Sequence, residues 1–328
     1  MASNATASTS GIVKKVASLI KNGQAKNIVV LTGAGISCAS GIPDFRSPGG
    51  MYDTLKPELL TASDNEKAEM KYDPTTVVSW DLFKNNQLPY LEVRRPFILG
   101  LAKRQWKPTL SHHFLSMLND RKILRRIYTQ NIDGLDYQLD TVPNDKIIPV
   151  HGSLGRIECE FCKHEMDLEK FHHLLETSIK DIYKLPNVQA PQKSDNILCP
   201  KCSKPGVKPA TVLYGSSLPS IFFEKVEDDL PICDLCIVIG TSLTVFPAAS
   251  VPSAVSQNCP RVLINRDRVG DCFDFASKRD FFLQGNCDEV VFDLIAELGW
   301  LEDLKTLLKL PSPILCESAM MDLKKKVV

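Results

Sequence analysis

The chain has no apolar run of the length that a transmembrane helix requires, which is about 20 residues. Its first ten residues, MASNATASTS, contain no hydrophobic core and no arginine, unlike a secretory signal or a transit peptide. We therefore expect a flexible tail over residues 1–10, no membrane contact, and a location in the cytoplasm, the nucleus or both.

The chain also lacks an excess of charge of either sign. Lysine and arginine number 39, as do aspartate and glutamate, and the formal net charge is zero. Proteins attract nucleic acid with a broad basic surface, so we expect no direct sequence-specific nucleic-acid binding. With 44% hydrophobic and 24% charged residues, the 328-residue chain is typical of a globular protein that buries a sizeable core.

Cysteine, by contrast, is abundant, with 11 residues. Two Cys-x-x-Cys pairs stand in a polar part of the sequence: Cys159, Cys162, Cys199 and Cys202. Four thiolates in two such pairs suit a tetrahedral zinc site that leaves no position for water. The pattern predicts one structural Zn²⁺. A third pair, Cys233 and Cys236, lies in an apolar run, where we expect both side chains in the core.

Short apolar segments rich in β-branched residues alternate with helical patterns along most of the chain. Such segments predict parallel strands buried on both faces, and the alternation predicts a doubly wound sheet. The expected strands are residues 27–32, 124–129, 147–150, 211–214, 235–241, 261–265 and 280–283. The expected helices include residues 11–22, 111–119 and 248–257, and a last helix that Asp288 caps.

Two stretches interrupt this alternation. Residues 49–105 are polar and weakly helical, and residues 156–207 hold the two cysteine pairs. The predicted fold class is therefore α/β: a Rossmann-like doubly wound parallel sheet, with a smaller domain made of a helical insertion and a four-cysteine zinc module. The predicted boundaries are 11–48, 106–155 and 208–300 for the Rossmann-like domain, 49–105 for the insertion, 156–207 for the zinc module and 301–328 for a loose tail.

A glycine motif follows the first expected strand, Gly33-Ala34-Gly35-Ile36-Ser37. Glycines at this point let the backbone approach a phosphate or a ribose. Cys38 replaces the third glycine of the common dinucleotide fingerprint, so a plain tight turn stays an equal alternative for this motif alone. The next loop contains Asp44, Phe45 and Arg46, which suit a flap that shields a cofactor from water; the alternative is a surface loop with an ion pair.

Polar residues also follow the second and third expected strands, at the sheet edge where ligands bind. Asn131 and Asp133 alternate along the chain, so an amide and a carboxylate would face one pocket and suit a nicotinamide and a ribose. A turn is the alternative for this Asn-x-Asp-Gly segment. His151 ends the next strand, and an imidazole with a reference pKa of about 6.5 is a candidate base for a ribose hydroxyl. The other five histidines lie in polar helical patterns, where we expect no special role.

Three later segments suit the adenosine half of a dinucleotide. Gly240-Thr241-Ser242 and Asn265-Arg266 each follow a buried strand, and residues 285–288 follow the last one.

Taken in order, these motifs resemble the sirtuins. The matching segments are GAGIS, SGIPDFRS, TQNIDGLD, HG, the two Cys-x-x-Cys pairs, KPATVLYG, GTSLTVFP and INR, from about residue 28 to about residue 290. SPGGMYDTL, DLFKNNQLPY and YTQNID are most similar to the class I sirtuins. The resemblance implies an NAD-dependent protein-lysine deacylase that consumes NAD and yields free lysine, nicotinamide and an O-acyl-ADP-ribose.

The resemblance also assigns residues to roles. His151 is the general base, and Asn131 belongs to the same catalytic site. NAD contacts are expected from Gly33, Ala34, Gly35, Ile36, Asp44, Phe45, Arg46, Gln130, Asn131, Ile132, Asp133, Gly240, Thr241, Ser242, Asn265, Arg266 and Cys287. Substrate contacts are expected from Val212, Leu213, Tyr214 and Gly215. The implied partners are acylated-lysine proteins, for which histones and tubulin are candidates.

Two other classes of protein stay open. One is a mono-ADP-ribosyltransferase that uses the same NAD site, and the other is a non-catalytic zinc-containing scaffold. The retained Asn131, Asp133 and His151 argue against the scaffold. Departures from the family pattern, such as Ser216 where an acidic residue is usual, concern the substrate groove.

The acyl group that is removed can also be predicted by resemblance. Sirtuins that remove acidic acyl groups are similar to one another in a Tyr-x-x-Arg element after the PDFRS loop. Alignment of residues 80–86 places Phe83 and Asn86 at the Tyr and Arg positions. A carboxylate would lose hydration there without gaining a charged partner, which predicts a preference for neutral acyl groups.

Overall fold

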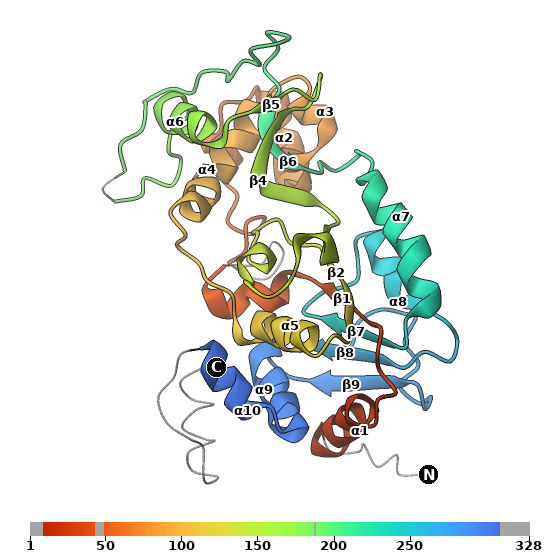
Figure 1. Cartoon of the computed structure of the whole chain (residues 1–328). Helices are drawn as coiled ribbons and strands as arrows, with labels where there is room; N and C mark the ends of the chain where they lie inside the picture. Colours follow the sequence, from red (N-terminus) through yellow and green to blue (C-terminus); the bar gives the residue numbers. More distant parts are fainter. Residues whose placement is uncertain (1–8, 43–48, 187, 309–328) are drawn as a thin grey trace.

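Two sheets occupy different parts of the molecule in the computed structural model, which describes residues 9–42, 49–186 and 188–308 (Figure 1). The larger sheet has six strands in the order β3-β2-β1-β7-β8-β9, and the smaller has three in the order β5-β4-β6. The strands are β1 (Ile28–Thr32), β2 (Leu124–Thr129), β3 (Ile147–Pro149), β4 (Gly152–Cys159), β5 (Glu165–Met166), β6 (Val207–Thr211), β7 (Leu235–Ile239), β8 (Arg261–Asn265) and β9 (Asp280–Gln284).

All neighbouring strands of the larger sheet are parallel. The chain builds β1, β2 and β3 in one direction, and later builds β7, β8 and β9 outward from the other side of β1. This order confirms the predicted doubly wound sheet. The order in which the chain adds strands to the sheet reverses between β1 and β7. Open α/β sheets bind ligands at the carboxyl ends of the strands beside such a point.

Helices cover both faces of the larger sheet. On one face lie α1 (Thr9–Lys21), α5 (Leu110–Asp120), α9 (Cys287–Leu298) and α10 (Leu301–Leu307), and on the other lie α7 (Ser220–Asp229) and α8 (Val251–Ala254). Successive side chains of a strand point to opposite faces, so Val30 packs in the first core while Val29 and Leu31 pack in the second. All three are fully buried, as a central parallel strand requires.

The smaller sheet has a hydrophobic core of its own, which it shares with four helices: α2 (Asp64–Tyr72), α3 (Trp80–Phe83), α4 (Leu88–Ala102) and α6 (Leu168–Ser178). Figure 1 shows this part above the larger sheet. Short 3-10 helices complete the described chain: η1 (Ala34–Ser40), η2 (Pro57–Leu59), η3 (Pro74–Val78), η4 (Asp136–Gln138), η5 (Asn144–Lys146), η6 (Leu230–Ile232) and η7 (Ala248–Ser250). Within the described ranges, no helix combines the length and apolarity needed to cross a bilayer.

The expected strand at residues 211–214 is wrong. The strand there is β6, which ends at Thr211 and pairs with β4 in the smaller sheet, while Tyr214 forms only an isolated bridge with Ser79. Pro209 lies inside β6 and has no N–H for a sheet. An edge strand tolerates this loss because one of its sides needs no partner, and β6 is at the edge.

Two predictions for the C-terminal part of the chain also need correction. The helix expected over 248–257 is broken into η7 and the four-residue α8, because Pro252 suits the first turn of a helix and not its interior. Residues 301–308 are not part of a loose tail: α10 places Leu304 fully in the core, with Leu301 and Leu308 packed beside it. Residues 309–328 lie outside the described ranges.

Asp288 does not cap its own helix. α9 begins at Cys287, and the carboxylate of Asp288 accepts hydrogen bonds from the backbone N–H groups of Ser111 (2.9 Å) and Leu110 (3.3 Å). Asp288 therefore accepts hydrogen bonds from free N–H groups in the first turn of α5, across the interface between the two helices.

His112, one of the five histidines for which no special role was expected, is a core residue. It is fully buried in the first turn of α5, and its Nδ1 lies 2.8 Å from the hydroxyl of Thr109 in a capping box. Burial, helped by neighbouring His113, lowers the pKa of His112 to about 3.

This buried histidine predicts a loss of stability in acid. The unfolded chain takes up the proton near the reference pKa of about 6.5, whereas the folded chain does not until about pH 3, so stability falls as the pH falls below 6.5. The contribution is about 2 kcal/mol between pH 8 and pH 5. Urea unfolding of the wild type and of His112→Gln, which keeps a side-chain acceptor for the cap, should differ by this amount in pH dependence. Equal pH dependence would contradict it.

Candidate functional site

A cavity of about 950 Å³ opens at the carboxyl ends of β1, β2, β7 and β8, beside the point where the strand order reverses. It also reaches the end of β6 and helix α4 of the smaller part. The predicted site residues that line it are Gly33, Ala34, Gly35, Gln130, Asn131, Ile132, His151, Val212, Leu213, Tyr214, Gly215, Gly240, Thr241, Ser242, Asn265, Arg266 and Cys287.

Two of the predicted NAD contacts lie elsewhere. Ile36 is fully buried in the core of the larger sheet. Asp133, together with Asn131, lines a small neighbouring pocket, and its carboxylate accepts a 2.7 Å hydrogen bond from Ser37. Asp44, Phe45 and Arg46 lie outside the described residues.

The glycines of the cleft allow β1 and β7 to continue into loops that touch. The amide of Gly35 donates to the carbonyl of Gly240 over 2.7 Å. A Cβ on Gly33 would lie 2.5 Å from the Cβ of Thr241, and one on Gly35 would lie 2.6 Å from the Cα of Gly240. Bare backbone therefore forms the floor of the cleft, which suits the approach of a pyrophosphate or a ribose. This observation supports a dinucleotide in the cleft and weighs against the reading of a plain turn.

Gly240→Ala should disrupt this floor. Gly240 has a φ of +61°, and a Cβ there would lie 2.5 Å from the amide nitrogen of Ile36. Left-handed strain and overlap with backbone together cost about 2–4 kcal/mol, so we expect a lower melting temperature and at least a tenfold weaker NAD affinity. Calorimetry measures both. Gly155→Ala is the matched control, because its Cβ meets only Ser153 Oγ at 3.5 Å; equal effects of the two changes would refute the role of Gly240.

The loop after β2 is held by hydrogen bonds to the loops after β1 and β7. Asn131 donates from Nδ2 to the carbonyl of Gly33 (3.1 Å) and to the hydroxyl of Ser37 (3.2 Å). Gln130 donates from Nε2 to the hydroxyl of Thr241 (3.0 Å). Burial raises the pKa of Asp133, against the opposing effect of its hydrogen bonds from Leu135 and Ser37. These contacts fix the amide of Asn131 at the cavity wall.

His151 stands where the chain passes from the larger sheet to the smaller one, between β3 and β4. Its Nδ1 lies 2.9 Å from the carbonyl of Gln130, and a carbonyl only accepts, so Nδ1 carries the proton. Nε2 is then the basic nitrogen; it is buried and has no hydrogen-bond partner among the described residues. Burial lowers the pKa of His151, although the bond to Gln130 opposes the shift. The imidazole is thus neutral near pH 7 and able to take a proton inside the cavity.

The predicted substrate segment, residues 212–215, has one edge already paired. Val212 donates to the carbonyl of His151 (2.9 Å), Tyr214 donates to the carbonyl of Val78 (3.0 Å), and Trp80 donates to the carbonyl of Tyr214 (2.9 Å). All four residues of the segment line the cavity. An extended peptide in the cavity would therefore meet a segment whose position is fixed from behind.

The structure places the two residues predicted to meet the acyl group away from the cavity. Phe83 is only 1% exposed and packs edge-on against Tyr90, while the amide of Asn86 donates to the carbonyl of Thr61. Neither lines the cavity; from α4, Tyr90 and Arg94 do. The preference for neutral acyl groups stays a prediction. The two α4 residues were missed because they reach the cavity through the packing of α4 beside β6.

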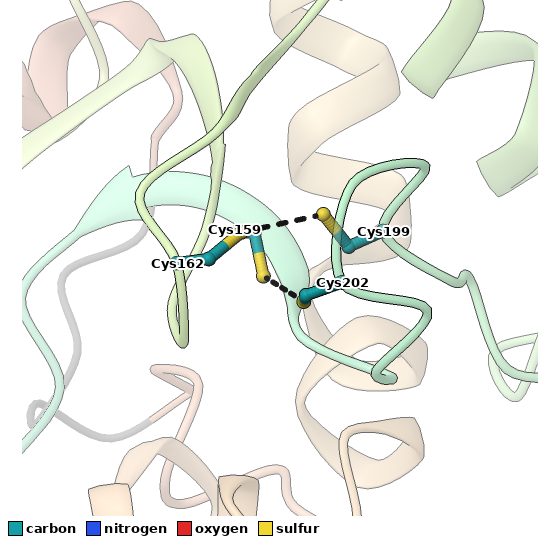
Figure 2. A group of neighbouring side chains, drawn as sticks. All are labelled: Cys159, Cys162, Cys199 and Cys202. Carbon is teal, nitrogen blue, oxygen red and sulfur yellow. Dashed lines mark hydrogen bonds between the residues drawn. The ribbon is translucent and has the colours of Figure 1, made fainter.

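The four cysteines of the two pairs come together in the smaller part (Figure 2). Cys159 ends β4, and its Sγ lies 3.7 Å from that of Cys202; the Sγ atoms of Cys162 and Cys199 are 3.6 Å apart. All four sulfurs lie within 4.8 Å of one another. A tetrahedron with metal–sulfur distances of about 2.3 Å has edges of about 3.8 Å, so the arrangement fits Zn²⁺.

The two pairs also adopt the same kind of backbone turn. Lys163 donates to the carbonyl of Cys159 (2.8 Å), and Ser203 donates to the carbonyl of Cys199 (2.9 Å). Both donors have a left-handed φ, of 56° and 58°. Each turn brings its two thiols to the same side, which makes a preformed four-thiolate site. The third pair behaves as predicted, since Cys233 and Cys236 are buried in the core.

A glycine-floored cleft at the switch point of a parallel sheet, next to a closed four-thiolate module, defines a dinucleotide-binding α/β protein with a structural metal site. The model of the Sir2 family matches residues 33–247. The chain is 38% identical to NAD-dependent protein deacetylase hst2 of Schizosaccharomyces pombe. The match covers 90% of this chain and 79% of that protein. It is likewise 35% identical to NAD-dependent protein deacetylase sirtuin-2 of Danio rerio, covering 90% of this chain and 74% of that one. The chain belongs to the Sir2 family, which confirms the resemblance.

Proposed function

We propose that this chain is an NAD-dependent protein-lysine deacetylase in which His151 is the general base. The observation that carries the proposal is the buried, basic Nε2 of His151 in the same cavity as the glycine floor of the cleft. The relatives named above are NAD-dependent protein deacetylases, which supports the same activity here.

Different residues of the cavity bind NAD, bind the peptide and transfer the proton. When bound, NAD supplies an anomeric carbon that takes up the acyl oxygen as nicotinamide leaves. Gly33, Gly35 and Gly240 receive the phosphates, and Asn131 orients the nicotinamide end. His151 takes the proton of a ribose hydroxyl at Nε2, while the carbonyl of Gln130 stabilises the positive charge that the ring gains. Residues 212–215 pair with the backbone of the acylated peptide. The zinc is structural and takes no part in the chemistry.

Mass spectrometry of a reaction with NAD and an acetylated peptide tests the proposal. We expect free lysine and O-acetyl-ADP-ribose in equal amounts. A peptide that gains the mass of ADP-ribose would indicate the mono-ADP-ribosyltransferase instead. No change in either reactant, with zinc still bound, would indicate the scaffold.

The domain boundaries, the location and the protein substrates stay predictions. The separate core of the smaller sheet supports a second domain, which limited proteolysis between the two parts would test. Fluorescence microscopy tests the cytoplasmic or nuclear location, and acetylated histone and tubulin peptides test the two candidate substrates.

A further inference from the structure

A lysine is fully buried between the zinc module and the end of β6. The ammonium of Lys208 lies 2.9 Å from Oε2 of Glu160 and donates to the carbonyls of Pro209 (3.1 Å) and Thr211 (2.6 Å). These three oxygens match the three N–H groups of an ammonium. A buried charge is costly unless it is paired in this way, so a role in packing alone would be served better by an apolar side chain of similar size.

The two residues of this ion pair belong to different parts of the structure. Glu160 stands inside the first cysteine pair, between Cys159 and Cys162, and its amide donates to the carbonyl of Gly206 (2.8 Å). Lys208 belongs to β6, two residues beyond Gly206. The ion pair therefore joins the zinc module to the strand that leads into the cavity.

The shortest contact of Lys208 is to a peptide group that faces the catalytic histidine. The carbonyl of Thr211 and the amide of Val212 belong to the same peptide group. That amide donates to the carbonyl of His151 over 2.9 Å. A cation on the carbonyl polarises the peptide group and strengthens the hydrogen bond that its N–H donates. The contacts thus run from Lys208 to the 211–212 peptide group and on to the backbone of His151.

The neighbourhood leaves this peptide group little freedom. The side chain of Thr211 is 2.8 Å from the hydroxyl of Tyr90, and both residues line the cavity. A Cβ on Gly152, which follows His151, would lie 2.0 Å from the carbonyl oxygen of Ala210. A rotation of the 211–212 peptide group would therefore move His151 and the segment that receives the substrate together.

We propose that Lys208, held by Glu160 of the zinc module, is a positioning residue that orients the 211–212 peptide group, and through it His151 and the substrate segment. This inference rests on the proposed deacetylase activity. The cleft floor at Gly33 and Gly240 is not part of this set of contacts. Loss of the ammonium should therefore impair use of the acylated peptide and leave NAD binding intact.

Lys208→Met, which keeps the length of the side chain without its charge, is the test. In the zinc-loaded full chain we expect kcat/KM for an acetylated peptide to fall at least tenfold, with a raised peptide KM and an NAD Kd within twofold of wild type. Hydrogen exchange at the amide of Val212 should accelerate, a readout that needs no activity. A purely structural defect would instead lower the active fraction, so that kcat would fall with an unchanged peptide KM.

Lys163→Met is the matched control. Lys163 is the other lysine on Glu160, 3.1 Å from Oε1, and its side chain is 61% exposed. We expect this variant to keep the wild-type constants. If Lys208→Met does not fold, the double variant Lys208→Met with Glu160→Gln carries the same expectation, because it leaves no charged, partly buried carboxylate opposite an apolar side chain.

The outcomes separate this inference from the proposed function. A folded Lys208→Met or double variant with wild-type peptide KM, kcat and Val212 exchange overturns the positioning role, whereas an inactive wild type overturns the deacetylase itself. Even if the wild type is inactive, an unchanged rate of hydrogen exchange at Val212 in Lys208→Met would contradict the proposal that Lys208 orients this peptide group.

Discussion

His151→Ala is expected to lower kcat for deacetylation by a factor on the order of 10² or more, while the protein folds and binds NAD. The change removes the buried Nε2, which has no hydrogen-bond partner among the described residues. The glycine contacts between the loops after β1 and β7 do not involve the imidazole, so the cleft should persist. Steady-state kinetics, calorimetric NAD titration and thermal unfolding measure the three quantities.

His173→Ala is the control for this prediction, because His173 is exposed on α6 in the smaller part of the molecule. It should leave kcat unchanged. Near-normal turnover of His151→Ala would remove the assignment of His151 as the base. Unfolding of that variant would show a structural role, and His151→Asn, which is close in size, would then be measured.

The lowered pKa of His151 predicts the pH dependence of the wild type. Burial disfavours the charged imidazolium, so the neutral, active form persists below the ordinary pKa of about 6.5. Activity should therefore stay on its plateau at pH 7 and be lost only as the pH falls through the lowered value. An acid limb centred above pH 6.5 would contradict the burial of the base.

The larger sheet was predictable because its strands are encoded locally. Apolar, β-branched runs such as 28–32 and 235–239 are buried on both faces, and their short length and β-branched residues favour a strand over a helix. Two of the failures have tertiary causes. β6 survives with Pro209 because it lies at an edge, and Asp288 serves α5 because the two helices pack together. The helix α10, by contrast, has a local signal, because Leu301, Leu304 and Leu308 recur at helical spacing in the sequence.

The candidate site was predictable where its chemistry follows a strand. The glycines, Asn131 and His151 stand at carboxyl ends of parallel strands, which necessarily meet at one edge of a sheet. Tyr90 and Arg94 could not be found this way, since α4 reaches the cavity only by packing beside the smaller sheet. The misplacement of Phe83 and Asn86 has the same origin, because aligned positions say nothing about which side of a helix faces the cavity.

Replacement of Cys199 and Cys202 with serine should release the metal from the protein. Zinc content is expected to fall from one ion per chain to nearly none, because two thiolates cannot hold the tetrahedral site. Structural zinc contributes about 10–16 kcal/mol of apparent binding free energy in small modules, which is far more than the smaller sheet can lose and stay folded. Elemental analysis and circular dichroism measure the two effects.

Activity should be lost in the same variant, although the zinc site holds no catalytic group. β4 runs from Gly152, the residue after His151, to the zinc ligand Cys159, and β6 pairs with it at both ends, at Gly152 and over residues 157–159. When the module unfolds, the strands that fix His151 and the 211–212 peptide group lose their support, while the glycine cleft on the larger sheet remains. We therefore expect NAD binding to survive better than turnover. Cys272→Ser, a thiol outside the metal cluster, should keep zinc and activity. A metal-free double variant with full activity would show that the module does not support the catalytic site.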